Sequence, residues 1–208
     1  QAELFDIIIN ELNRIGIMIP IRHVSNSAAI VNYPELSMEL VRPGIILYGV
    51  YPGPEIDRTK INLKPAMTLK TSIAMIKSVE SNTSISYGRK FTTQRESLIA
   101  TIPVGYADGY SRLLNGKSRV LVNGQFAPVV GSICMDQCMV DITDIKEEVK
   151  IGDEVVLLGR QGDYEITADE LAHLIGTIPY EILCIIGKRV PRVYFKNGEV
   201  VNVLNYLV

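Results

Sequence analysis

The first residues of this sequence that could do chemistry are two groups of hydrogen-bond donors near the N-terminus. Asn26 and Ser27 follow an apolar run and open a predicted helix, where backbone N–H groups and the helix dipole favour an anion. Residues 42–45, Arg-Pro-Gly-Ile, place a cation and a bare backbone amide beside a second apolar run. Both groups would suit a phosphate, although an ordinary capped helix and an ordinary glycine turn explain the same spacing.

Tyrosine is the second chemical resource of the chain, which has ten Tyr against four Phe and no Trp. Tyr87, Tyr106 and Tyr110 each adjoin a glycine, so each phenol could be held at a loop tip that faces a cleft. A phenol acts as an acid or base from a reference pKa of about 10, and it needs cationic neighbours to ionise. From the residues alone, packing of the large ring, with a partner for its hydroxyl, is the simpler interpretation of each tyrosine.

The other reactive residue types have simpler interpretations. His23, at the end of an apolar run, is most simply a hydrogen-bonded structural residue, and His173 lies inside a predicted helix. Asp136 lies at a bend between two apolar strands, where a carboxylate commonly shapes the turn. The three Cys lack partners at metal-ligand spacing and are interpreted as core residues, so we predict no metal site.

The elements that must position these residues change in kind along the chain. The first part predicts a helix over residues 2–14, buried strands at 17–21 and 45–48, and a helix capped by Ser25 or Asn26 between them. This alternation is typical of a parallel α/β sheet. About two such units fit before residue 52, too few for a closed barrel, so we predict the end of a larger structure.

After a stretch rich in Pro and charge at residues 51–65, strand signals dominate. Two Asn-Gly pairs, at 123–124 and 197–198, lie between apolar alternating segments and predict tight hairpins. Thr167 and Glu170 form the pattern of a capping box and predict one short helix. This part is therefore predicted to be a mostly antiparallel β domain with one short helix.

Composition excludes several classes of protein. The chain has 208 residues, of which 47% are hydrophobic and 21% charged, with a net charge of −2. This balance excludes a basic nucleic-acid footprint as the main function. The apolar runs are too short to span a bilayer, and no secretory signal pattern opens the chain. An odd number of Cys suggests a reducing compartment, so we predict a cytoplasmic protein.

Several strings of the sequence, taken together, resemble one family, the alanine racemases, which are pyridoxal-phosphate enzymes with a barrel followed by a β domain. They occur in the family's order with family-like spacing and cover nearly the whole chain. The strings are HVSNSAA (23–29), VRPGI (41–45), LYG (47–49), SYG (86–88), PVGYADG (103–109), GSICMDQ (131–137), PYE (179–181) and RVPR (189–192). The resemblance implies an α/β barrel remnant, the end of a TIM-like cofactor-binding barrel, over residues 1–58 and a β-rich domain over residues 59–208.

The resemblance also implies the residues that bind the cofactor, pyridoxal 5′-phosphate. Arg42 would hydrogen-bond the pyridine nitrogen, and His23 would orient this arginine. The groups that would hold the cofactor's phosphate are the hydroxyl of Ser27, the amides of Gly44 and Ile45, and the hydroxyl of Tyr180.

For the substrate, the resemblance implies that Tyr87 is catalytic and handles the α-proton on one face, while a lysine works on the other. Met135 and Asp136 would contact the substrate carboxylate, and Tyr106 would line the entrance of the site. In this family the β domain of one subunit reaches the barrel of the other in a head-to-tail homodimer. Tyr87 and Met135 would then serve the partner's cofactor.

The lysine that carries the cofactor in this family has no counterpart among the motifs of this chain. We therefore expect the 208 residues to be the C-terminal portion of a longer enzyme, cut inside the barrel and inactive by itself. The predicted parent activity is the interconversion of L- and D-alanine for bacterial cell-wall synthesis. The alternatives are a serine racemase of the same family and an inactive dimerisation and folding module.

Overall fold

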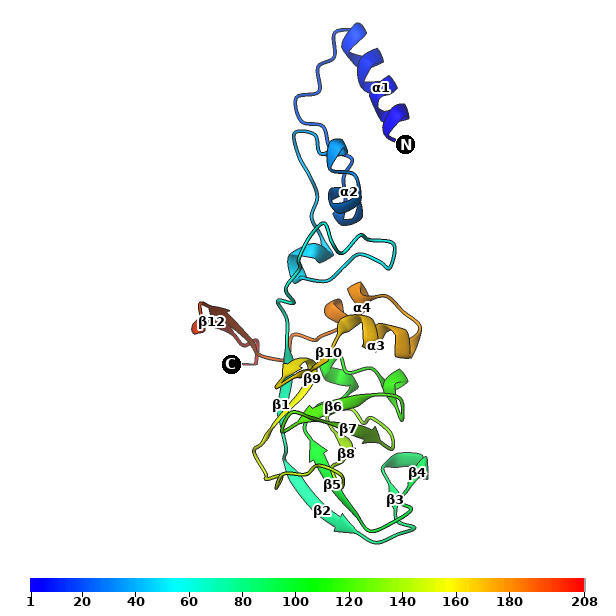
Figure 1. Cartoon of the computed structure of the whole chain (residues 1–208), viewed down its shortest axis with the longest axis vertical. Coiled ribbons are helices and arrows are strands. Elements are labelled where there is room, and N and C mark those ends of the chain that lie inside the picture. Colours follow the sequence, from blue (N-terminus) through cyan, green and yellow to red (C-terminus); the bar gives the residue numbers. More distant parts are fainter. Residues whose placement is uncertain (208) are drawn as a thin grey trace. The chain divides into compact units, whose positions relative to one another are not determined.

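The computed structural model describes residues 1–207, and the chain divides into two compact units, Gln1–Ala66 and Met67–Val208. Residues 51–65, the stretch rich in Pro and charge, belong to the first unit. None of the helices over residues 1–207 is long and apolar enough to cross a membrane. Figure 1 labels the α-helices and most of the strands of both units.

The first unit consists of short helices joined by loops. Its elements are α1 (Ala2–Arg14), α2 (Ser27–Asn32) and the 3₁₀ helices η1 (Pro34–Leu36) and η2 (Ile45–Tyr48). The predicted helix 2–14 is confirmed. The predicted cap is confirmed in Asn26, whose side chain accepts the N–H of Ala29 at 3.0 Å and so satisfies one of the free donors of the first turn of α2.

The two buried strands predicted in this unit are wrong. Residues 17–21 are neither helix nor strand, and they are exposed, with Met18 reaching 75% exposure. Residues 45–48 form η2 instead of a strand. A strand is held by hydrogen bonds to neighbouring strands. Over residues 1–66 no second strand pairs with these runs, so their apolar composition alone does not make them strands.

The second unit is built on one curled antiparallel sheet, in which the strand order is β1-β9-β6-β7-β8-β5-β2, with β10 paired to β9. Its two ends, β1 and β2, are separated in the chain only by residues 73 and 74. The strands are β1 (Leu69–Ser72), β2 (Met75–Val79), β5 (Ser97–Ile102), β6 (Arg119–Val122), β7 (Gln125–Val130), β8 (Cys138–Asp141), β9 (Glu154–Gln161) and β10 (Tyr164–Ile166).

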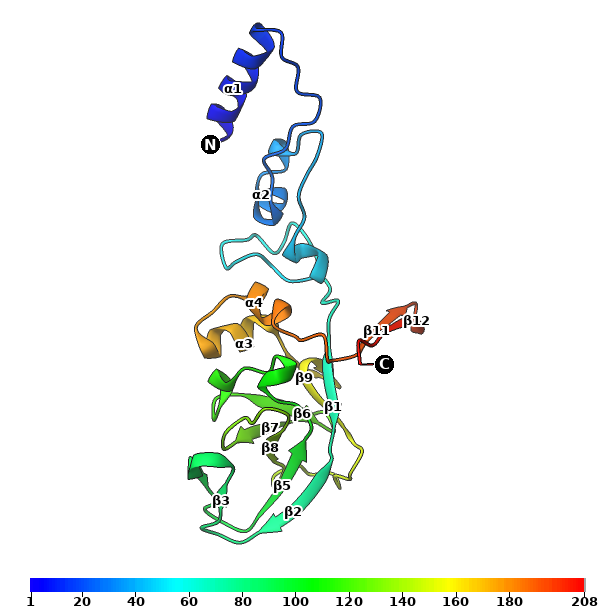
Figure 2. The same ribbon diagram turned by 180° about the vertical axis from the view of Figure 1, so that it is seen from behind.

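Two small hairpins accompany this sheet. One is β3 (Ser84–Ile85) with β4 (Phe91–Thr92), and the other is β11 (Arg192–Lys196) with β12 (Glu199–Leu204). Figure 2 shows the β11–β12 hairpin standing apart from the curled sheet. Both Asn-Gly predictions are confirmed, because Asn123-Gly124 joins β6 to β7 and Asn197-Gly198 joins β11 to β12, all four with positive φ.

Two helices, α3 (Ala168–Ile175) and α4 (Pro179–Cys184), pack against each other in this unit. The predicted helix is α3, and its cap is Thr167, whose hydroxyl accepts the N–H of Glu170 at 3.0 Å. The Glu170 carboxylate forms an ion pair with Arg119 on β6 and thereby ties α3 to the sheet. The sequence reasoning missed α4, although Pro at its first position is a helix-start signal.

The core of the second unit is the inner face of the curled sheet, closed by apolar side chains of α3 and α4. Apolar strand residues fill it, with consecutive residues buried in β6 and β9, and α3 contributes Leu171 and Ala172. The largest fully buried side chains include Ile73, Ile102, Leu121, Leu157 and Ile166. This packed core leaves the loops after β5 and β7 as the rigidly supported places where a site can be built.

Candidate functional site

The second unit contains an open cavity of about 590 Å³, and four sequence-predicted residues line it. They are Tyr87, Tyr106, Met135 and Asp136, which come from three separate segments of the chain. The structure thus brings together the predicted catalytic tyrosine and the three predicted substrate-binding residues. The full lining is Tyr87, Tyr106, Arg112, Ser132, Ile133, Cys134, Met135, Asp136 and Gln137.

Two of the lining loops are joined directly through their backbones. The N–H of Tyr106 donates to the carbonyl of Cys134, and the N–H of Ala107 donates to that of Met135, both at 3.0 Å. The approach is possible because residue 105 is glycine. A Cβ on Gly105 would lie 2.2 Å from the Cys134 carbonyl oxygen and 2.4 Å from that of Met135. The positions of Tyr106 and Met135 are therefore coupled.

An arginine outside the cavity lining strengthens this connection. Arg189 lies 2.9 Å from Asp108 through its Nε and 2.7 Å from Asp136 through an Nη. The other oxygen of Asp108 accepts the N–H of Gly105 at 2.9 Å. Asp136, predicted from its position to shape a turn, is thus also the partner of Arg189 in an ion pair. The RVPR string contains Arg189, but no pattern in the sequence pairs it with Asp136.

The electrostatics of the cavity include one cation that the sequence reasoning missed. Arg112, at the start of η5 (Arg112–Leu114), places its guanidinium 5.8 Å from the centre of the Tyr106 ring. It supplies positive charge in a cavity that also contains the Asp136 carboxylate. Because the Asp136 carboxylate is paired with Arg189, the guanidinium of Arg112 makes this cavity suited to a ligand that carries a carboxylate.

The third glycine-flanked tyrosine, Tyr110, has a purely structural place. It is buried, and its hydroxyl donates to Ser118 Oγ at 2.9 Å. Burial raises the pKa of this phenol above its usual value, since the charged form would lose its solvation. Packing is therefore the correct interpretation for Tyr110, whereas Tyr87 and Tyr106 face the cavity.

The cysteines divide in the same way. Cys138 is buried in the core, and desolvation raises the pKa of its thiol to about 12, so it stays protonated and unreactive. Cys134 lines the cavity, and Cys184 is exposed, so the prediction that all three are core residues is wrong. The reason for Cys184 is helical geometry: α4 buries Ile182, and a residue two positions further points to the opposite side.

The first unit brings together two of the predicted phosphate-binding residues. Ser27, at the start of α2, accepts the N–H of Gly44 on its hydroxyl oxygen at 2.7 Å. A Cβ on Gly44 would lie 3.4 Å from the same oxygen. Ile45 begins η2, so its N–H belongs to a first turn without intrahelical acceptors. The start of α2, which carries the Ser27 hydroxyl, therefore lies beside the start of η2.

Arg42 and His23 lie in contact within the same unit. One Nη of Arg42 is hydrogen-bonded to Nδ1 of His23 and also donates to the His23 carbonyl at 3.1 Å. The guanidinium can only donate, so Nδ1 of the histidine must act as the acceptor. The backbone N–H of Arg42 donates to the Ser25 carbonyl at 2.9 Å and holds the two segments side by side. The guanidinium of Arg42 is thus tied to both the side chain and the backbone of His23.

Tyr180, a predicted phosphate-binding residue, belongs to the second unit, where it lies on α4, is 38% exposed, and does not line the cavity. Among the described residues, no cluster of three or more His, Cys, Asp or Glu side chains could hold a metal ion.

Comparison with known proteins gives the same family for both units. Residues 66–194 match the family described as alanine racemase, C-terminal domain, and residues 1–52 match alanine racemase, N-terminal domain. An alanine racemase from Clostridium novyi (strain NT) is 60% identical over 207 residues, which are 100% of this chain and 54% of that protein. The chain thus spans about half the length of the curated relatives it matches.

Solved structures agree. An alanine racemase from Clostridium difficile 630, in complex with cycloserine, has a TM-score of 0.94 at 47% identity. The match covers 100% of this chain and 54% of the chain of that structure. The alanine racemase from Bacillus anthracis, with bound L-Ala-P, has a TM-score of 0.91 at 43% identity. The match covers 98% of this chain and 52% of the chain of that structure.

Proposed function

The chain belongs to the alanine racemase family, and from this membership we propose that it is the C-terminal half of an enzyme that interconverts L- and D-alanine with pyridoxal 5′-phosphate. The observation that carries the proposal is the convergence of Tyr87, Tyr106, Met135 and Asp136 on one cavity. The proposed division remains a barrel portion over residues 1–58 and a β-rich domain over residues 59–208.

The donors of the first unit fit the phosphate of this cofactor. The Ser27 hydroxyl accepts from Gly44 and keeps its own hydrogen for an anion, and the N–H of Ile45 points out of the first turn of η2. We propose that Ser27, Gly44 and Ile45 hold the phosphate, with the hydroxyl of Tyr180 as a further donor. A phosphate oxygen would compete with Ser27 for the Gly44 N–H.

Arg42 suits the ring nitrogen of the cofactor because a guanidinium cannot give up its proton. When bound, pyridoxal phosphate withdraws electrons from the α-carbon of an amino acid and makes the α-proton acidic. Arg42 would leave the ring nitrogen unprotonated and so moderate that withdrawal, which disfavours side reactions. His23, already bonded to Arg42, acts as the residue that orients it.

Tyr87 is the proposed acid and base of this chain. Racemisation requires that the proton leave one face of the α-carbon and return on the other, so it needs two groups on opposite faces. Tyr87, in the cavity of the second unit, transfers the proton on one face of the α-carbon. A lysine outside this chain transfers it on the other face. The loop of Met135 and Asp136 contacts the substrate carboxylate through the Met135 amide, and Tyr106 lines the entrance to the site.

The assembly we propose is a homodimer in which the two subunits share their active sites. Tyr87 and Met135 of one subunit serve the cofactor held by Ser27, Arg42 and Tyr180 of the other. Half of each site then comes from each chain, so the dimer is part of the mechanism. The 208 residues alone, without the lysine that carries the cofactor, would be inactive.

The substrate is tested by steady-state racemisation of alanine and of serine by the complete enzyme, followed by circular dichroism. We expect a higher kcat/KM for alanine, while the 208-residue chain alone gives no turnover. A higher kcat/KM for serine would replace the alanine assignment with a serine racemase. Turnover by the isolated chain would contradict the division of labour proposed above.

A further inference from the structure

The segment that carries Tyr87 is unusual for its combination of exposure and backbone strain. The Tyr87 side chain is 78% exposed, so packing does little to hold it. The residues around it adopt the left-handed region, with φ of 65° at Ser86 and 49° at Arg89, which non-glycine residues seldom occupy. Such a conformation persists only where the surroundings enforce it.

The surroundings that enforce it are two serines with reciprocal hydrogen bonds. Ser86 Oγ donates to the carbonyl of Ser132 at 2.8 Å, and Ser132 Oγ donates to the carbonyl of Tyr87 at 2.9 Å. Each hydroxyl thus binds the backbone of the opposite segment. Ser86 Oγ also lies 3.7 Å from Cys134 Sγ. Ser132 is only 3% exposed, so it is itself fixed by the core beneath it.

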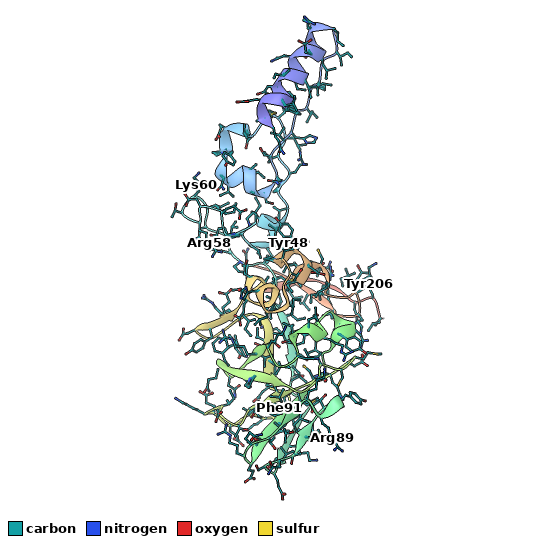
Figure 3. The ribbon with its side chains drawn as sticks, turned by 90° about the vertical axis from the view of Figure 1, so that its right-hand side faces the viewer. Tyr48, Arg58, Lys60, Arg89, Phe91 and Tyr206 are labelled. Carbon is teal, nitrogen blue, oxygen red and sulfur yellow. The ribbon has the colours of Figure 1, made fainter. Side chains whose placement is uncertain are left out.

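The residue before Ser132 makes this contact sterically possible. Gly131 has a φ of +70°, and a Cβ there would lie 2.7 Å from the Ser86 Cβ. The two segments therefore touch at a point where no larger residue fits. The segment is the turn of the β3–β4 hairpin, so its two ends are held by Ile85 and Phe91, which pair with each other and pack with Val130. Figure 3 labels Arg89 and Phe91 at the C-terminal end of the segment.

We infer, resting on the proposed function, that Ser132 and Ser86 are positioning residues that fix the backbone of Tyr87 and so aim its phenol at the substrate. The hydroxyl of Ser132 has the larger part, because it alone binds the carbonyl of the catalytic residue. Neither serine touches the reacting atoms in this account. Both act only through Tyr87.

A buried serine with a purely structural role is available for comparison in the same unit. Ser118 is also 3% exposed, and its hydroxyl accepts from Tyr110 and donates to the Leu114 carbonyl at 3.3 Å. It lies outside the cavity lining. Ser118→Ala therefore removes two hydrogen bonds, one more than Ser132→Ala, without touching the Tyr87 segment.

The experiment uses the complete enzyme and measures α-hydrogen exchange of L- and D-alanine separately in heavy water by NMR, together with thermal unfolding. Ser132→Ala is expected to slow exchange of one enantiomer, the one that depends on Tyr87, by roughly 10- to 100-fold. Exchange of the other enantiomer should change far less. Tyr87→Phe identifies the dependent enantiomer, and Ser118→Ala is the control with both exchange rates close to wild type.

Equal losses for both enantiomers, or no loss beyond that of Ser118→Ala, would overturn the inference. If Ser132→Ala does not fold, Ser86→Ala is measured in its place, because it removes the reciprocal bond from a less buried position. Equal losses of exchange for both enantiomers, or no loss beyond that of Ser118→Ala, would then overturn the inference. If the wild-type enzyme does not racemise alanine, both the proposed function and the inference that rests on it are wrong. If the wild-type enzyme is active and Ser132→Ala slows exchange of both enantiomers equally, only the inference is wrong.

Discussion

Tyr87→Phe is expected to lower alanine racemisation by about 10²- to 10⁴-fold, the contribution of one positioned acid or base. The phenol is the only group of this chain proposed to move the α-proton, and the substitution removes its hydroxyl while keeping the ring. Because the equilibrium constant between enantiomers is 1, kcat/KM must fall equally in both directions. Exchange of the α-hydrogen in heavy water should nevertheless survive for one enantiomer, the one deprotonated on the opposite face.

The matched control is Tyr110→Phe, which removes a phenol of the same unit. Tyr110 is buried and bonded to Ser118, so its loss should cost about 1 kcal/mol of unfolding free energy and leave racemisation close to wild type. If Tyr87→Phe keeps activity within a few-fold of wild type, or loses exchange of both enantiomers alike, Tyr87 is not the base.

Gly105→Ala should be the most disruptive small substitution in the cavity wall. The added Cβ would lie 2.2 Å from the Cys134 carbonyl oxygen and 2.4 Å from that of Met135, so the loops of Tyr106 and Met135 must separate. Overpacking against backbone should cost about 1–3 kcal/mol of unfolding free energy, measured with urea. Misplacement of both loops should lower racemisation by roughly 100-fold.

Gly116→Ala separates this steric effect from the general cost of losing a glycine. Gly116 has a φ of +64° but nothing within 4 Å of an added Cβ. It should lose about 1 kcal/mol of stability through its backbone conformation and keep its activity. A Gly105→Ala enzyme as active as Gly116→Ala would show that the two loops do not need to be held together.

The second unit was largely predictable because its signals are local. Asn123-Gly124 and Asn197-Gly198 need a positive φ that Asn and Gly tolerate, and Thr167 caps α3 through its own neighbours. In the first unit, residues 17–21 and 45–48 failed as strands because an apolar run does not reveal whether a partner strand lies beside it. Strand pairing is a non-local property.

The residues of the site likewise differ in whether a local sequence pattern indicates them. Tyr87, Tyr106, Met135 and Asp136 could be named from ordered strings, and the structure gathers them around one cavity. The ion pairs of Arg189 could not be named, because they join residues far apart in the chain. Arg112 lies only six positions after Tyr106, but no sequence pattern indicates that its guanidinium lies beside that ring. Ser132 lies inside a matched string, but only the structure shows that its hydroxyl meets the Tyr87 carbonyl.

The central claim is that this chain supplies Tyr87 to a cofactor held by another subunit, and complementation tests it most directly. Tyr87→Phe and a variant of the complete enzyme without its cofactor-bearing lysine should each be inactive. Mixed dimers should regain activity, because one of their two sites combines an intact lysine with an intact Tyr87. Mixtures that stay as inactive as either variant, although mixed dimers form, would contradict the shared site.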